Sequence, residues 1–273
     1  LFMGPVVAAF CIGFVWPFFQ GIYLSFCKFR LTSDAQFIGV GNYAAALSDA
    51  SFQHSFWYTA LTAVVSLVLI NVIAFLVAYL LTQKLRGSNI FRTVFFMPNL
   101  IGGIVLGYIW KLLLDGLIIR LFDSTLALNA TYGFWGLVIL LCWQQIGYMM
   151  IIYVAGLQNV PTEYLEAAQI DGAGPFTIFF RVMLPQARPI IVSLSVMQFI
   201  SAWNSYDVPL LYLPSYPTLS TALYLYKDNM FQLGLSTPTY FAGMLISIIP
   251  VAVLFLIFNK QIMNNISVGG MKG

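Results

Sequence analysis

The chain has 273 residues, of which 60% are hydrophobic and only 8% are charged, and its net charge is +3. A soluble globular chain carries about 25% charged residues, so a soluble fold would lack the polar side chains needed to cover its surface. The small net charge and the lack of a basic cluster in the sequence argue against nucleic acid as a partner. These properties predict an integral membrane protein in contact with lipid.

Six apolar segments are long enough to cross a bilayer as helices, which takes about 20 residues each. They lie at residues 1–26, 56–82, 93–114, 132–157, 190–213 and 239–258. None has the alternating pattern of a membrane β-strand, so we expect an all-α fold with six transmembrane helices in a single domain over residues 1–273. The first segment lacks the basic start and cleavage site of a secretory signal peptide. Because the sequence begins at Leu1 without a methionine, we expect that residues precede it.

The loops divide into two sets, because six crossings place both chain ends on the same side of the membrane. The set that contains the loop 83–92, the polar loop 158–189 and the C-terminal residues holds seven of the twelve basic residues: Lys84, Arg86, Arg92, Arg181, Arg188, Lys260 and Lys272. By the positive-inside rule, this small majority predicts that the polar loop and both termini are cytoplasmic.

The third segment contains the small-residue pattern Gly103-x-x-x-Gly107, which is typical of close contact between membrane helices; a pore-lining role is the alternative. The three cysteines, Cys11, Cys27 and Cys142, follow neither a disulfide framework nor a zinc-site spacing. We interpret them as small apolar side chains and expect no metal site.

The polar loop 158–189 interrupts the apolar pattern and holds three of the nine acidic residues. Pro161 followed by Thr162 predicts a short helix that Thr162 caps, and Gly172 predicts its end, because glycine readily adopts the left-handed cap conformation. A helix of this length is not stable alone, so we expect it to dock on a partner. Residues 176–183 are interpreted as a second helix on the membrane surface, and an ordinary amphipathic connector is the alternative.

The residues Glu166-Ala167-Ala168, then Gly172, then Val182-x-Leu184-Pro185 resemble the EAA motif of permease subunits of ABC importers, with valine where isoleucine is common. The wider segment LQNVPTEYLEAAQIDGAGPFTIFFRVMLP is similar to the carbohydrate-uptake branch of that family, which includes maltose-type permeases. The resemblance covers nearly the whole chain, because it extends to the segments FIGVGNYAAAL, RGSNIFRTVFFMPNLIGGIVLGYIW and SAWNSYDVPLL.

The resemblance implies a mechanism. The EAA helix would be a cytoplasmic coupling helix, between the fourth and fifth spans, that docks in a groove of an ATPase subunit. ATP-driven closure of two ATPase subunits would then move the spans between inward-open and outward-open states. The docking residues implied are Glu163, Glu166, Ala167, Ala168, Asp171 and Gly172.

The resemblance also implies the partners: two ATPase subunits, a second homologous permease subunit, and an extracellular or periplasmic solute-binding protein. It implies a multi-pass protein of a bacterial or archaeal plasma (inner) membrane. The chain itself would bind no cofactor, because ATP and Mg would lie in the ATPase subunits. The glycine-rich end at 269–273 is similar to tails that reach toward the ATPases in some members, and a disordered tail is the alternative.

The sequence offers little for catalysis. It contains no GxxxxGK[ST] phosphate loop, its single histidine, His54, has no nucleophile elbow near it, and the apolar segments lack paired carboxylates. We therefore expect no catalytic residue and no enzymatic activity in this chain.

The fifth segment has the most polar interior, which favours a role in a translocation path. Gln198, Ser201 and Ser205 recur at helical spacing, and an acidic residue in such a segment faces protein or water rather than lipid. Amides and hydroxyls bind sugar hydroxyls, and aromatic rings stack on sugar rings. The residues expected along the path are Gln144, Gln145, Tyr148, Gln198, Trp203, Asn204, Tyr206 and Asp207. Hydrogen bonding between helices is the alternative role for each of them.

The expected cargo is therefore a sugar or oligosaccharide. The first alternative is an ABC permease for a glycerophosphodiester or a polyol, although a phosphorylated cargo should favour Arg or Lys in the spans and only Lys111 lies near a span end. The second alternative is an ion-driven secondary transporter, which should show more buried ionisable residues and internal repeats.

Overall fold

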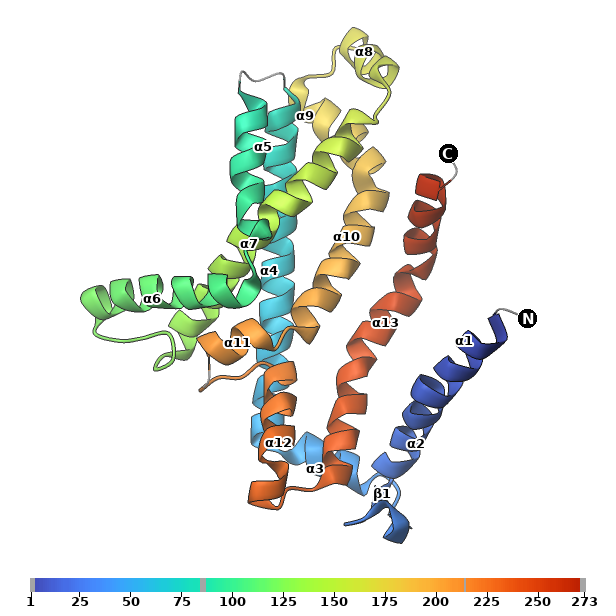
Figure 1. Ribbon diagram of the computed structural model, residues 1–273. Helices are drawn as coiled ribbons and strands as arrows, with labels where there is room; N and C mark the ends of the chain where they lie inside the picture. Colours follow the sequence, from blue (N-terminus) through green and yellow to red (C-terminus); the bar gives the residue numbers. More distant parts are fainter. Residues whose placement is uncertain (1–2, 84–86, 214, 271–273) are drawn as a thin grey trace. The chain divides into compact units, whose positions relative to one another are not determined.

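A computed structural model of the chain describes residues 3–83, 87–213 and 215–270, and helices form nearly all of its regular structure (Figure 1). The chain divides into two compact units. The first unit comprises Leu1–Thr59 and Pro217–Ala252, and the second comprises Ala60–Tyr216 and Val253–Gly273. Two long helices, α4 (Ala50–Thr82) and α13 (Thr237–Gly270), contribute residues to both units.

The first unit starts with three consecutive helical pieces: α1 (Met3–Phe10), a π-helical turn η1 (Cys11–Val15) and α2 (Trp16–Ser25). The π turn lies just before Pro17, which has no N–H with which to continue the α-helical ladder. The Trp16 N–H bonds to the Cys11 carbonyl, five residues earlier. In the second unit, another π turn, η4 (Phe179–Met183), lies in the same way before Pro185. The π turns therefore let both prolines remain inside long helices.

A small ordered region follows α2. The strands β1 (Cys27–Lys28) and β2 (Gln36–Phe37) pair antiparallel around the turn η2 (Thr32–Asp34), and α3 (Gly41–Ser48) comes next. The Asn42 Nδ2 group donates to the Ser25 carbonyl at 2.7 Å and to the Cys27 carbonyl at 2.8 Å. Because Asn42 is buried, these bonds satisfy an amide that would otherwise destabilise the fold.

The helix α12 (Leu219–Leu233) lies in the segment 214–238, which the sequence analysis treats as a loop between spans. Its first turn is tied to α4, because the Leu219 N–H donates to Thr59 Oγ1 at 2.6 Å. The helix ends at Gly234, whose φ of 62° is left-handed, and α13 begins three residues later.

The second unit is built around α7 (Ala130–Gln158), which is the most buried of the long apolar helices. Its other elements are the rest of α4 and α13, α5 (Ser88–Phe96), η3 (Met97–Leu100), α6 (Gly103–Phe122), α8 (Thr162–Ile170), α9 (Pro175–Ile178), η4, α10 (Leu184–Asn204) and α11 (Asp207–Tyr212).

A polar cluster in this apolar unit joins three helices. The Tyr153 hydroxyl of α7 donates to Asn71 Oδ1 of α4, and the Ser195 hydroxyl of α10 donates to the same oxygen at 3.3 Å. The Asn71 amide nitrogen donates to the Leu67 carbonyl of its own helix at 2.7 Å. Polar groups in an apolar environment must find internal partners, so this cluster fixes the mutual register of α4, α7 and α10.

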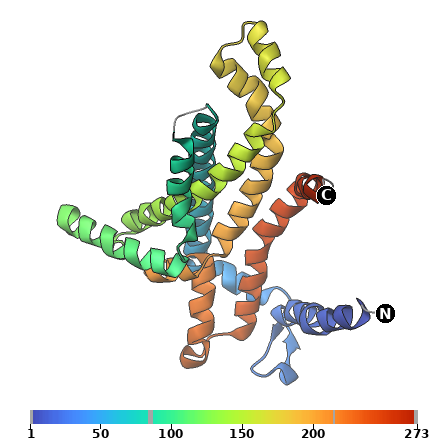
Figure 2. The same cartoon turned by 45° about the horizontal axis from the view of Figure 1, so that its top comes forward.

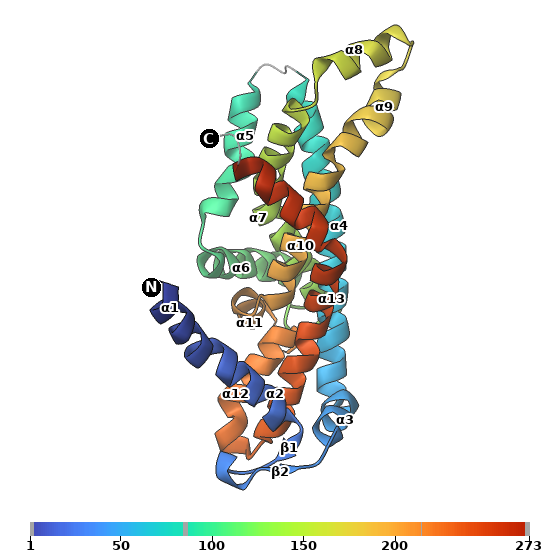
Figure 3. The same ribbon diagram turned by 90° about the vertical axis from the view of Figure 1, so that its right-hand side faces the viewer.

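Five helices among the described residues are long and apolar enough to cross a membrane: Met3–Ser25, Ala50–Thr82, Ala130–Gln158, Pro175–Asn204 and Thr237–Lys260. They correspond to the first, second, fourth, fifth and sixth predicted segments. The third, residues 93–114, is instead divided between α5 and α6, and α6 runs crosswise to α5 (Figures 1 and 3). Pro98 has no backbone N–H to donate to a helical hydrogen bond, and Gly102 disfavours the continuation of the helix. The helix therefore breaks between α5 and α6.

Three other predicted boundaries are wrong. The second long helix begins at Ala50 instead of residue 56, because residues 50–55 add turns to it. The fifth begins at Pro175 instead of residue 190 and ends at Asn204 instead of residue 213. Residues 176–183 are thus the first turns of that helix and not a separate surface helix, since the π turn before Pro185 keeps the helical chain continuous.

The C-terminal residues 259–270 are helical, as the end of α13, rather than an irregular polar tail. Several residues of the predictions lie outside the described residues: Lys84 and Arg86 of the loop 83–92, and the last three residues of the glycine-rich end, which include Lys272.

Candidate functional site

The helix α8 stands at one end of the second unit, beyond the ends of α4 and α5, in every view (Figures 1, 2 and 3). Its C-terminus has the geometry of a Schellman cap. Gly172 adopts a left-handed φ of 77°, its N–H donates to the Gln169 carbonyl at 3.0 Å, and the Ala173 N–H donates to the Ala168 carbonyl at 2.9 Å. The predicted end of this helix at Gly172 is confirmed.

The predicted start of α8 is wrong by one residue. Thr162 is the first residue of the helix and not its cap, and Pro161 occupies the cap position without a side-chain hydrogen bond. The proline restrains the preceding backbone, so the helix starts directly after it. Glu163 lies in the first turn, where the helix dipole favours a negative charge.

One face of α8 is turned away from the rest of the second unit. Five of the six predicted docking residues are exposed: Glu163, Glu166, Ala167, Asp171 and Gly172. The sixth, Ala168, is half-buried, as is Leu165, and these two residues form the inner face. The structure therefore brings the predicted residues together on one short helix and its cap.

The sequence analysis missed the apolar part of this surface. Ile170 is 86% exposed and Phe176 is 81% exposed, which makes them the most exposed large apolar side chains among the described residues. Ile170 follows Glu163 and Glu166 at helical spacing, so the same periodicity could have identified it. Apolar side chains this exposed beside acidic ones are typical of an interaction surface.

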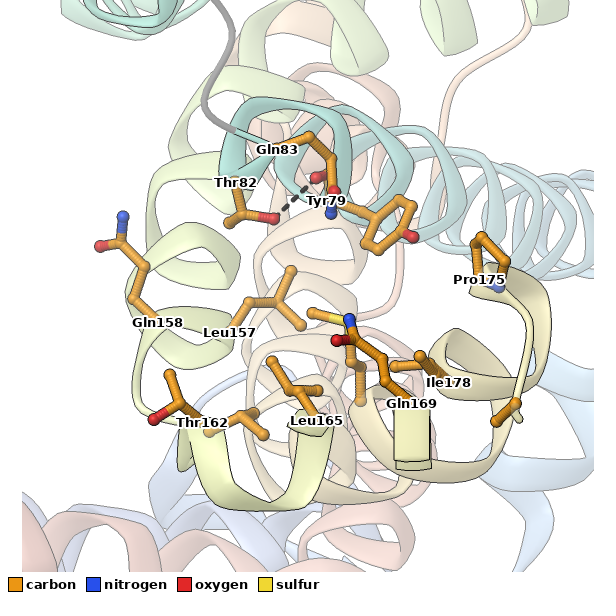
Figure 4. A pocket seen from close by; sticks show the side chains of 13 residues that line it. Tyr79, Thr82, Gln83, Leu157, Gln158, Thr162, Leu165, Gln169, Pro175 and Ile178 are labelled. Atoms are coloured by element: carbon orange, nitrogen blue, oxygen red, sulfur yellow. Dashed lines mark hydrogen bonds between the residues drawn. The ribbon is translucent and has the colours of Figure 1, made fainter. Parts of the chain in front are cut away.

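A cavity of about 450 Å³ lies on the inner side of α8 (Figure 4). Leu165 and Gln169 of α8 line it, and the ends of α4 and α7 and the start of the fifth helix complete it. Figure 4 shows the Gln169 side chain reaching from α8 into the cavity, whereas the Gln158 amide points away from it. The sequence analysis did not anticipate this space.

The predicted path residues on α7 are accessible. Gln144 and Gln145 are half-buried, and Tyr148, one turn further along, is exposed. A Cβ atom added to Gly103 at the start of α6 would lie 3.9 Å from Gln144 Nε2. The break between α5 and α6 therefore lies beside the polar part of α7.

The predicted path residues of the fifth segment fall into two groups. Gln198 and Trp203 are buried, and the Trp203 ring stacks on Phe199 with centroids 5.4 Å apart, so both fit a packing role better than a path role. Asn204 and Tyr206 are exposed at the end of α10.

The helix ends at Asn204, so Ser205 is not part of the helical row that the sequence analysis proposed for it. Asp207 begins α11 and is half-buried, which means that it is not inside the fifth long helix as predicted. The adjacent Val208 packs against both glycines of the Gly103-x-x-x-Gly107 pattern, at 3.4 and 3.6 Å from the added Cβ atoms. The break after Asn204 thus lies near the break before Gly103. Within the described residues, no group of three or more His, Cys, Asp or Glu side chains could hold a metal ion.

Residues 84–267 match the protein family described as "Binding-protein-dependent transport system inner membrane component". "Probable starch degradation products transport system permease protein AmyD" of Thermoanaerobacterium thermosulfurigenes is 38% identical over 216 residues, which cover 76% of this chain and 73% of AmyD. "sn-glycerol-3-phosphate transport system permease protein UgpA" of Yersinia pseudotuberculosis serotype I is 31% identical over 211 residues, which cover 73% of this chain and 71% of UgpA.

The fold is also similar to that of a solved transporter. One chain of a structure titled "Crystal structure of a bacterial ABC transporter involved in the import of the acidic polysaccharide alginate" superposes with a TM-score of 0.77 at 16% sequence identity. The superposition covers 96% of this chain and 94% of that one. The family match spans more than half of the chain, so the protein belongs to the inner-membrane permease components of binding-protein-dependent ABC transport systems.

Proposed function

We propose that this chain forms half of the translocation path of an ATP-driven importer for a neutral sugar or oligosaccharide. The proposed cargo is based on the similarity to AmyD, which is 38% identical over 76% of this chain. The name of AmyD assigns it to the transport of starch degradation products. The six expected path residues that are not buried support a neutral cargo, because they offer amides, a carboxylate and aromatic rings but no lysine or arginine.

Within this proposal, the exposed face of α8 docks on a cytoplasmic ATPase subunit. Glu163, Glu166 and Asp171 favour a groove with basic side chains, and Ile170 supplies an apolar anchor. Full burial of an isoleucine side chain stabilises an interface by about 1.5–3 kcal/mol. The rigid capping of α8 by Gly172 transmits movement of the ATPase to the helices on either side.

The complete importer contains two ATPase subunits, which bind ATP and Mg, a second homologous permease subunit and a solute-binding protein outside the membrane. This chain supplies a single transmembrane domain and no catalytic residue. Its termini and α8 are cytoplasmic, and the pieces α5, η3 and α6 together make the third of six crossings. The half-buried Gln145 and the exposed Tyr148, Asn204 and Tyr206, which lie beside the two helix breaks, line the path.

The coupling role is tested by co-purification of the ATPase subunit with the Glu166→Ala and Ile170→Ala variants. We expect Ile170→Ala to weaken the association on the order of tenfold or more, because about 1.4 kcal/mol corresponds to a factor of ten. Thr177→Ala is the matched control, since Thr177 is also exposed but lies beyond α8. Undiminished ATPase recovery with both α8 variants would remove α8 from the interface.

The path role is tested with Asn204→Ala and Gln145→Ala, by measuring sugar uptake and substrate-stimulated ATP hydrolysis. We expect the apparent affinity or the transport rate to fall in both variants, while Gln198→Ala, which alters a buried side chain, lowers the thermal stability. Wild-type uptake in both the Asn204→Ala and the Gln145→Ala variants would show that these residues lie outside the path.

A glycerophosphate-type cargo is the second candidate, and the 31% identity to UgpA over 73% of the chain favours it. An anionic cargo should need cationic groups along the path, and the expected path residues contain none. Competition of uptake by glycerol 3-phosphate, with maltose as the comparison, distinguishes the two cargoes.

A further inference from the structure

We infer that the cavity beneath α8 is a second, cytoplasmic binding site for a neutral mono- or disaccharide, through which imported sugar slows the importer. Two parts of this inference rest on the proposed function: that the cavity lies on the cytoplasmic side, and that a bound sugar slows transport. The site itself rests on the shape and the chemistry of the cavity.

The size and charge of the cavity define the class of ligand. Its volume of about 450 Å³ lies within the range of about 300–1,000 Å³ that is usual for small-molecule sites. Thirteen of the residues that the structure describes line it, and none of these is acidic, basic or histidine. A phosphate, carboxylate or ammonium group would lose its hydration there without gaining a charged partner. The ligand is therefore uncharged.

The polar groups of the cavity match hydroxyl groups. The Gln169 amide projects into the cavity from α8, and Gln83 lies beside Tyr79 and Thr82 on the α4 side (Figure 4). Neither glutamine amide forms a side-chain hydrogen bond within the part of the chain that the structure describes. Each amide offers both donors and an acceptor, which suits a sugar hydroxyl that both donates and accepts.

The Thr82 hydroxyl adds a further acceptor. It donates its proton to the Tyr79 carbonyl at 2.7 Å, so its lone pairs remain for a donor on the ligand. The cavity thus presents polar groups on two opposite sides, one from α4 and one from α8.

Apolar side chains form the remaining wall, with Leu157 of α7, Leu165 of α8 and Ile178 at the start of the fifth helix. Such a wall accommodates the C–H faces of a sugar ring. A purely apolar ligand would bury the amides without partners, which is unfavourable. An acyl chain fits better in a different cavity of about 310 Å³, which Val72, Phe75 and Leu76 of α4 line together with other mainly apolar side chains.

The position of the cavity relates ligand binding to transport. Gln169 and Leu165 face the cavity, while Ile170 and Glu166 of the same helix face outward to the proposed ATPase groove. A ligand that contacts both Gln169 and the end of α4 binds best when α8 keeps its present distance from α4. A ligand shifts a conformational equilibrium by its difference in affinity for the two states. Occupancy therefore holds α8 in one position and slows the ATP-driven cycle.

The test uses the complete permease–ATPase complex in lipid nanodiscs, without the solute-binding protein, and saturation-transfer NMR with maltose and with glucose. Binding in the cavity is measured as the difference between the saturation-transfer signals of the sugar with wild type and with the Ala173→Phe variant, whose phenyl ring occupies the cavity. We expect Gln169→Leu to weaken this binding about tenfold, since it removes the amide hydrogen bonds. Gln186→Leu is the matched control and should bind as wild type does, because Gln186 is exposed on α10 and does not line the cavity. Glucose 6-phosphate should give no cavity signal.

The second measurement is ATP hydrolysis stimulated by the loaded binding protein, with excess maltose added. We expect inhibition in wild type and in Gln186→Leu, and a shift of the inhibition curve to about tenfold higher maltose in Gln169→Leu. The cavity site is refuted if wild type and Ala173→Phe give the same signal with both sugars. The cavity site is also refuted if the Gln169→Leu variant binds the sugars as tightly as wild type does. Sugar uptake by the same complex tests the proposed function separately, so a complex that transports sugar without a cavity signal refutes this inference alone.

Discussion

A single glycine of α7 sets how closely α5 can approach. A Cβ atom added to Gly147 would collide with the Phe95 carbonyl oxygen of α5, so the two backbones are in direct contact. The sequence analysis instead singled out Gly103 and Gly107, whose added Cβ atoms would meet Val208 at ordinary contact distances. The GxxxG spacing correctly indicates a packing contact there, but the closer contact lies at a glycine that belongs to no such pattern.

We predict that Gly147→Ala destabilises the protein by at least about 1–3 kcal/mol, the usual cost of overpacking, because the Phe95 carbonyl is backbone and cannot move aside alone. Thermal unfolding of the purified protein in detergent measures the effect. Gly116→Ala is the matched control, since Gly116 lies inside α6 with nothing within 4 Å of an added Cβ. It should stabilise slightly, as alanine favours a helix more than glycine. Equal melting temperatures for the two variants would contradict the backbone contact.

At the scale of helices, the cluster of Asn71, Tyr153 and Ser195 explains why α4, α7 and α10 pack in one register. Apolar side chains alone specify register weakly in lipid, because lipid is as apolar as the helix surfaces. One amide oxygen that accepts from two other helices removes this ambiguity. The cluster also lies apart from the exposed polar residues near the helix breaks, so we assign it a structural role.

We predict that the Asn71→Leu and Tyr153→Phe variants are each less stable and that their effects are not additive. The expected coupling energy in a double-mutant cycle is about 0.6–1.7 kcal/mol, the range for hydrogen bonds between membrane helices. The comparison cycle pairs Tyr153→Phe with Ser66→Ala, because the Ser66 hydroxyl donates only within α4. That pair should be additive within about 0.5 kcal/mol. Additivity in both cycles would show that the cluster does not couple α4 to α7.

The helices could be predicted where their structure depends on residues close together in the sequence. Five of the six spans predicted from apolar runs correspond to long apolar helices, and Gly172 predicted the end of α8, because both signals are local in the sequence. The break near Pro98 was missed, since Pro17 and Pro185 show that a proline in an apolar run can also be absorbed by a π turn. Which outcome occurs depends on packing against neighbouring helices, which a single sequence does not contain.

The same reasoning applies to the candidate sites. The EAA resemblance identified most of the α8 surface, because its residues are consecutive in the chain. Helical spacing also grouped Gln198 with Ser201, although Gln198 is buried and Ser201 is exposed. Spacing predicts which residues share a face but not whether that face meets a neighbouring helix or water. The cavity beneath α8 could not be predicted at all, since it is formed by four segments far apart in the sequence.

For the whole molecule, the topology depends on the third crossing. The helix α5 has only 9 residues, too few to cross a bilayer alone. The helix α6 has 20 residues but carries Lys111, Asp115 and Arg120, and a break separates it from α5. If they cross the membrane together, the chain crosses six times and its termini share one side. If α6 instead returns to the side on which α5 begins, the number of crossings is five, and the loops that follow reverse their sides.

We predict that the third crossing is complete, and single-cysteine labelling tests it. In a variant without Cys11, Cys27 and Cys142, cysteines at the exposed residues Asn89 and Thr177 should react with an impermeant maleimide only from the cytoplasmic side. Cysteines at the exposed residues Asp123 and Asp228 should react only from the outside. Asn89 lies in the first turn of α5 and Asp123 directly follows α6, so this pair reports the third crossing directly. Thr177 with Asp228 serves as the control pair across the fifth helix. Labelling of Asn89 and Asp123 from the same side would show that the third segment re-enters, and it would leave α8 and the N-terminus on opposite sides of the membrane.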